Sequence, residues 1–119
     1  MQSRRQPLDI SVRKYGEVHV IELRGDLKIG EPVDGFRQAI EQLFDAGESQ
    51  IVVNVAAVPM IDSSGIGVLV RSLTSAKQRG GALKLVNPSK LAVQTLKIVG
   101  LINLFEIFND QAQAVESFG

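Results

Sequence analysis

The sequence predicts a single α/β domain, in which a mixed, mostly parallel sheet of about five strands packs with about four helices. Two observations lead to this prediction. Apolar runs with the spacing of strands alternate with runs of helical spacing, in the order ββαβαβαβα. Between the first two strand-like runs, Gly16 and Glu17 can form the turn of an antiparallel hairpin. The later strands are separated by helices, so we expect them to run parallel.

The N-terminal half supplies the hairpin, one helix and a central strand. Within residues 10–14, the apolar Ile10 and Val12 alternate with polar side chains, which is a weak strand signal. Residues 18–23 are richer in apolar side chains and form a clearer predicted strand. Residues 33–44 carry apolar side chains at helical spacing, and Gly47 follows where a helix C-cap belongs. Residues 51–55 are apolar on both faces, as a central strand covered by helices should be.

The C-terminal half continues the alternation. An amphipathic helix is predicted over residues 66–76, in which Val68 lies off the apolar stripe and is expected at the surface. Residues 82–86 and 105–108 are predicted strands. A third helix lies between them, with inward-facing side chains expected at Leu91, Thr95, Leu96 and Val99. Asp110 is expected to cap a short last helix.

Composition excludes several classes of protein. Lys+Arg 13 and Asp+Glu 13 give a formal net charge of zero, so we expect no direct binding of nucleic acid, which normally needs a basic excess. The chain has no cysteine and a single histidine, so it cannot form disulfides, thiolate nucleophiles or a metal site with paired histidine ligands. We therefore expect no metal and no cofactor. The apolar runs are far shorter than the ~20 residues that cross a membrane. We therefore expect a cytoplasmic protein without direct membrane insertion.

One loop has more features than a helix start requires: Asp62-Ser63-Ser64-Gly65, between the central strand and the second helix. Asp62 or Ser63 is a natural N-cap, because its side-chain oxygen can accept the N–H groups of the first turn. Capping does not explain the second hydroxyl, nor Gly65 and Gly67, since each glycine costs a helix about 1 kcal/mol relative to alanine. Gly67 lies one turn after Ser63 on the same face, which leaves space for a partner or a kinase to approach the Ser63 hydroxyl.

This loop matches no catalytic motif. A dinucleotide fingerprint would need glycine where the chain has Val70, and a P-loop would need Gly-Lys followed by Ser or Thr. A nucleophile elbow would need glycine two residues before Ser63, where the chain has Ile61. His19, on a strand predicted to be buried, is expected to be structural. We therefore expect no catalytic residues and no enzyme activity.

The Asp62-Ser63-Ser64-Gly65 turn, set between an apolar strand and an apolar helix, closely resembles the signature of STAS domains, above all that of the bacterial anti-sigma factor antagonists. The resemblance covers residues 8–118, which would form the STAS domain after a flexible lead-in over residues 1–7. Further landmarks follow in the family's order: Gly25-Asp26-Leu27, Asn54-Val55, Gly80-Gly81 and Gly100-Leu101.

The resemblance implies a switch. Family members bind an anti-sigma factor that is itself a serine kinase and so free the sigma factor. The kinase phosphorylates the first serine of the motif, which ends the binding, and a serine phosphatase reverses the modification. This implies Ser63 as the phosphorylation site in a monomer or weak homodimer. We expect the partner-binding surface to comprise Gly25, Asp26, Leu27, Asp62, Ser63, Ser64, Gly65 and Gly67.

A second function remains open at this point. The chain could be the STAS regulatory subunit of a membrane transporter or of a lipid-transport ABC system. In that case Ser63 would be a contact or capping residue and would never carry phosphate. The two hypotheses differ in whether the Ser63 hydroxyl accepts a phosphoryl group.

Overall fold

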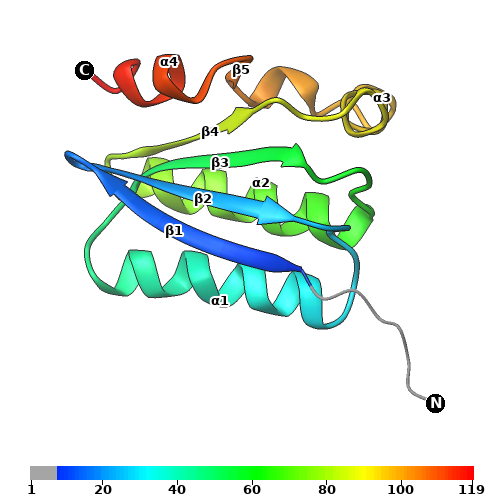
Figure 1. Cartoon of the computed structure of the whole chain (residues 1–119), viewed down its shortest axis with the longest axis horizontal. Helices are drawn as coiled ribbons and strands as arrows, with labels where there is room; N and C mark the ends of the chain where they lie inside the picture. Colours follow the sequence, from blue (N-terminus) through cyan, green and yellow to red (C-terminus); the bar gives the residue numbers. More distant parts are fainter. Residues whose placement is uncertain (1–7) are drawn as a thin grey trace.

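The structure is a computed structural model that describes residues 8–119; the lead-in expected over residues 1–7 lies outside the described residues. One five-stranded sheet runs through the molecule in the order β1-β2-β3-β4-β5 (Figure 1). β1 pairs antiparallel with β2, and every later pair of neighbours is parallel. The strands are β1 (Asp9–Tyr15), β2 (Val18–Arg24), β3 (Gln50–Ala57), β4 (Ala82–Val86) and β5 (Ile107–Phe108).

Helices connect the parallel strands. Because the strand order follows the chain order, right-handed crossovers place the first three helices on one face of the sheet. The last helix follows β5 and is free to cover the other face. The fold class and the order ββαβαβαβα are confirmed. The helices are α1 (Glu31–Asp45), α2 (Ser63–Gln78), α3 (Lys90–Ile98) and α4 (Gln111–Glu116), with a 3-10 turn, η1 (Ile102–Leu104), before β5.

The two faces of the sheet carry separate hydrophobic cores. The larger core includes the fully buried Phe36 of α1 and Leu96 of α3. The smaller core packs Ala114 of α4 against the sheet. β3 contributes to both, with Val53 in the larger core and Val52 in the smaller one. Its continuous apolar run is therefore explained by burial on both faces.

Two expectations for individual elements are wrong. Val68 is only 1% exposed, because α2 packs against both α1 and β4 and so buries more than one stripe of its surface. The last strand spans only Ile107–Phe108. Phe105, expected in that strand, instead turns into the larger core after η1.

The inward face of α3 also differs from the prediction. Ala92 and Leu96 are buried, whereas Leu91 and Val99 are exposed. The Ser89 hydroxyl caps this helix by accepting from Ala92 N–H at 3.0 Å, and it donates to the Pro59 carbonyl at 3.2 Å. These bonds fix the N-terminus of α3 on the loop after β3, so that its small Ala92 face lies against the core.

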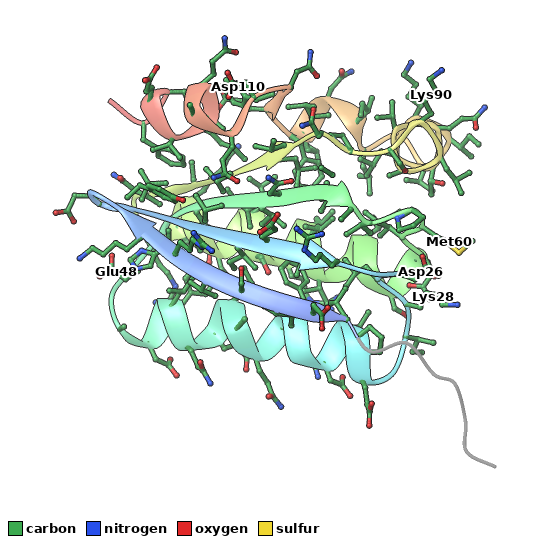
Figure 2. The ribbon with its side chains drawn as sticks, in the orientation of Figure 1. Asp26, Lys28, Glu48, Met60, Lys90 and Asp110 are labelled. Carbon is green, nitrogen blue, oxygen red and sulfur yellow. The ribbon has the colours of Figure 1, made fainter. Side chains whose placement is uncertain are left out.

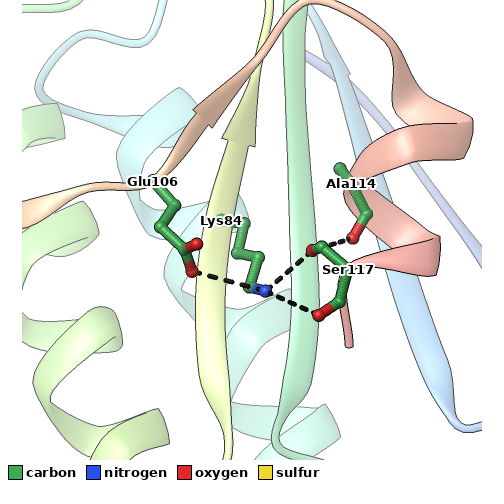
Figure 3. A network of polar contacts seen from close by, with 4 residues as sticks. All are labelled: Lys84, Glu106, Ala114 and Ser117. Carbon is green, nitrogen blue, oxygen red and sulfur yellow. Dashed lines mark hydrogen bonds and ion pairs between the residues drawn. The ribbon is translucent and has the colours of Figure 1, made fainter. Parts of the chain in front are cut away.

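A buried lysine holds α4 on the sheet (Figure 3). The side chain of Lys84 on β4 is 8% exposed, and its Nζ donates to Ser117 Oγ at 2.7 Å. The same Nζ lies 3.3 Å from a carboxylate oxygen of Glu106 and 4.2 Å from the centre of the Phe118 ring. Ser117 Oγ donates in turn to the Ala114 carbonyl at 2.6 Å. Since an isolated helix of 6 residues is unstable in water, α4 depends on these contacts.

We predict that Lys84→Ala lowers the free energy of unfolding by about 1–3 kcal/mol, because it removes a buried donor and uncovers the Phe118 ring. Amide hydrogens of α4 should exchange faster. Glu106→Gln should have little effect, because the Glu106 side chain is 65% exposed and such ion pairs contribute little. Urea unfolding and hydrogen exchange measured by NMR check both variants; equal stability of the two would contradict this role of Lys84.

Candidate functional site

The ends of β2 and β3 bring two loops together at one end of the sheet. Figure 2 shows Asp26, Lys28 and Met60 at this end and Glu48 at the opposite end. A parallel bridge between Leu27 and Ile61 joins the two loops. Within it, Leu27 N–H donates to the Met60 carbonyl at 2.9 Å. The Gly25-Asp26-Leu27 loop therefore lies directly beside the Asp62-Ser63-Ser64-Gly65 turn.

Asp62 connects this bridge to the start of α2. It is the N-cap residue, and its Oδ1 accepts from Gly65 N–H at 3.0 Å. Its Oδ2 accepts from Ile29 N–H, in the other loop, at 2.9 Å. Its own N–H donates to the Leu27 carbonyl at 3.1 Å. One residue thus caps the helix and fixes the neighbouring loop.

The electrostatic surroundings keep the Asp62 carboxyl ionised. Partial burial raises the pKa of this carboxyl, but hydrogen bonds donated by the N–H groups of Gly65, Ile29 and Ser64 lower it more, with a further contribution from the Lys28 charge. The net pKa lies below the usual value for aspartate. At neutral pH, both hydrogen bonds are therefore accepted by a charged carboxylate, which makes them stronger than neutral ones.

The two glycines of the turn have different environments. A Cβ on Gly65 would lie 2.8 Å from Ile61 Cγ2 and 2.8 Å from the Leu27 carbonyl oxygen. Gly65 is therefore required by the close approach of the two loops. A Cβ on Gly67 would meet only the guanidinium of Arg71, at 3.3 Å. We expected from the sequence that a partner could approach through the space beside Gly67, but Arg71 partly fills this space.

Ser63 is the first residue of α2 and is exposed, whereas Ser64 is partly buried. Exposed apolar side chains flank it: Ile29, which hydrogen-bonds Asp62 through its N–H, is 75% exposed, and Met60 is 41% exposed. We call the group formed by Asp26, Lys28, Ile29, Met60 and Ser63 the Ser63 surface. Neighbouring exposed apolar side chains of this kind are typical of protein-binding sites.

The residues predicted for the site all lie at this end of the sheet, but they are not equally accessible. Leu27 and Gly65 are buried, so they hold the loops together and offer no side-chain surface. Sequence reasoning missed Ile29, Met60 and Arg71, which no motif distinguishes from ordinary surface residues. The remaining predicted residues are partly or fully exposed: Gly25, Asp26, Asp62, Ser63, Ser64 and Gly67.

Two kinds of feature are not found over residues 8–119. No group of three His, Asp or Glu side chains is placed to hold a metal ion. None of the helices in this range has the length and apolar character needed to cross a membrane.

The contrast between the two glycines gives a testable prediction. Gly65→Ala should lower the free energy of unfolding by about 1–3 kcal/mol, because the added methyl group meets backbone and a buried side chain. Gly67→Ala is the matched control and should be neutral or stabilise by up to about 1 kcal/mol, since Arg71 can move and alanine favours the helix. Urea unfolding measures both; equal stability of Gly65→Ala and Gly67→Ala would contradict a close contact between the two loops at Gly65.

A second prediction concerns pH. The Asp62 pKa is lower in the folded chain, so its stabilising contribution is present above the unfolded pKa of about 3.9 and is lost as the pH falls through the folded pKa. Asp62→Asn retains a cap oxygen for Gly65 but cannot accept both N–H bonds. The stability difference between the wild type and Asp62→Asn should therefore be largest near neutral pH and should shrink in acid. Urea unfolding at about pH 7 and pH 3 measures it; a difference that does not change with pH would contradict the assignment.

Solved structures of known proteins share this fold. A candidate anti-sigma factor antagonist of Thermotoga maritima superposes with a TM-score of 0.85 at 24% sequence identity, covering 92% of this chain and 93% of that one. The anti-sigma factor antagonist SpoIIAA in its unphosphorylated form gives 0.80 at 22% identity, covering 92% and 95% of the two chains. SpoIIAA of Bacillus in its phosphorylated form gives 0.74 at 22% identity, covering 92% and 98%.

Sequence comparison gives the family. The model of the STAS domain matches residues 9–114. The anti-sigma-B factor antagonist of Bacillus subtilis is 30% identical over 99 residues, which cover 83% of this chain and 81% of that protein. The resemblance carried by the Asp-Ser-Ser-Gly turn is confirmed. The chain therefore belongs to the STAS domain family, and its relatives there include anti-sigma factor antagonists.

Proposed function

We propose that this chain is an anti-sigma factor antagonist that binds an anti-sigma factor with serine kinase activity, and that phosphate on Ser63 switches the binding off. The observation that carries the proposal is the exposed Ser63 hydroxyl, held at the start of α2 beside exposed Ile29 and Met60. The relative named anti-sigma-B factor antagonist supports the partner class. A structural neighbour solved with and without phosphate supports the switch.

In the unphosphorylated state, the Ser63 surface has the properties of a docking site. Ile29 and Met60 supply apolar area at its centre, which gains free energy when a partner removes it from water. The Asp26 carboxylate and the Lys28 ammonium lie 3.8 Å apart at its edge, where charges guide orientation more than affinity. By occupying the anti-sigma factor, the chain would displace the sigma factor by mass action.

Phosphoryl transfer would require only a nucleophile from this chain. Ser63 Oγ attacks the γ-phosphorus of ATP bound to the kinase partner, the new O–P bond forms, and ADP leaves. The hydroxyl proton passes to a base of the partner. Exposure of Ser63 on the first residue of a helix allows the active site of the partner to reach it. A serine phosphatase would later hydrolyse the ester with water.

The phosphate would change binding without unfolding the domain. It adds about −1.5 to −2 charges at neutral pH, which suits the positive end of the α2 dipole. The same charge lies among Ile29 and Met60, so a docked partner would have to desolvate it. The neighbouring carboxylate of Asp62 and any acidic group of the partner would be repelled. The fold is therefore expected to persist while the complex is lost.

We predict that Ser63→Glu keeps the free energy of unfolding within about 0.5 kcal/mol of wild type, yet weakens the complex with the cognate anti-sigma factor about 100-fold. Ser63→Ala should keep the affinity, because it adds no charge. Calorimetric titration of the purified proteins measures the affinities. An equally tight complex with Ser63→Glu would overturn the proposal.

The neighbouring serine provides the control for phosphorylation itself. After incubation with the co-encoded kinase and ATP, mass spectrometry should place phosphate on Ser63. The label should disappear in Ser63→Ala and remain in Ser64→Ala, because Ser64 is partly buried. No transfer to Ser63 from any co-encoded kinase would contradict the switch and favour a regulatory subunit of a membrane transporter or a lipid-transport ABC system.

A further inference from the structure

We propose that Arg71 binds the phosphate group on Ser63, reaching it across the bare backbone of Gly67. The inference rests on the proposed function only for the presence of that phosphate. The group that would bind the phosphate is therefore a side chain of this chain itself, two turns further along the same helix.

The spacing along α2 places the three residues in one row. Ser63, Gly67 and Arg71 are four residues apart, and such residues are neighbours on one face of a helix, with Cβ positions about 5–6 Å apart. Ser63 and Arg71 are both exposed. Because Gly67 has no side chain, nothing from that position separates the two.

The guanidinium of Arg71 already lies along this row. A Cβ built on Gly67 would have Arg71 Nη1 at 3.3 Å, Nη2 at 3.8 Å and Cζ at 3.9 Å as its nearest neighbours. The side chain therefore runs back toward the N-terminus of α2, which is the direction that helical side chains favour. Its charged end lies one turn closer to Ser63 than its own backbone does. The proposed contact requires the phosphate on Ser63 to turn toward Gly67, where the guanidinium lies.

Arg71 is also available as a partner. Within residues 8–119, no hydrogen bond or ion pair involves its side chain, whereas Arg37 pairs with Asp34 at 2.7 Å and Lys28 with Asp26 at 3.8 Å. A guanidinium presents two parallel N–H donors that match two oxygens of a phosphate. Unlike Arg37 and Lys28, Arg71 therefore has a charge that no carboxylate of the described residues neutralises, on the same helix face as Ser63.

This contact would explain why position 67 is glycine, although glycine lowers the stability of a helix. A side chain at position 67 would fill the gap that the guanidinium and the phosphate share. In the phosphorylated chain, the Arg71 bond would hold the phosphate over α2, so that the inactive state is defined by a fixed geometry as well as by charge.

The test uses the full chain with phosphoserine installed at position 63 during translation, so that no kinase is required. Titration followed by ³¹P NMR gives the second pKa of the phosphate. A guanidinium in contact favours the dianion, so Arg71→Gln should raise this pKa by about half a pH unit or more relative to the unsubstituted phosphoprotein. Arg71 is exposed, and the substitution should leave the fold intact.

Lys77→Gln is the matched control. It removes the same charge from the same helix, but Lys77 lies roughly 20 Å along the axis from Ser63, beyond the screening length of physiological salt. Its phosphate pKa should equal that of the unsubstituted phosphoprotein. An unchanged pKa in Arg71→Gln, or an equal rise in both variants, would overturn the contact. A failure of kinase labelling would instead count against the proposed function and would leave this titration unaffected.

Discussion

The Asp62 carboxylate accepts one hydrogen bond from each of two chain segments: Gly65 N–H in α2 at 3.0 Å and Ile29 N–H in the loop after β2 at 2.9 Å. The first bond starts the helix at Ser63, and the second places exposed Ile29 beside it. The two loops can approach this closely because Gly65 has no Cβ: the Leu27 backbone occupies the space that a Cβ on Gly65 would need. The exposure of the serine and the composition of its surroundings therefore follow from one capping interaction.

The sheet provides the frame for this arrangement. Since β2 and β3 are parallel neighbours, the loops at their ends meet at the same edge, and the larger core beneath them fixes their separation. The opposite face has a different task. There, Lys84 and the residues around it attach α4 to the sheet. None of these residues belongs to the Ser63 surface, so the smaller core completes the fold without contributing to that surface.

Sequence patterns were sufficient for the order of elements and for the turn at Ser63, because periodicity and capping are local properties. They failed where packing decides the outcome. Val68 is buried because α2 has two neighbours, and Leu91 is exposed because the cap of α3 sets its rotation. Lys84 and Arg71 were not recognised, since the direction of a long side chain depends on what surrounds it. For Arg71, that surrounding is the missing side chain of Gly67.

Under the proposed function, the Asp62 bonds hold the surface around Ser63 in place before modification, so phosphate on Ser63 would change the charge of that surface and leave the fold unchanged. Comparison of ¹H–¹⁵N spectra of the unmodified chain and of the chain with phosphoserine at position 63 tests this claim directly. Shifted amide signals should be confined to the two loops and the first turns of α2, within residues 25–31 and 59–71. Shifts spread through the strands and α4 would contradict it.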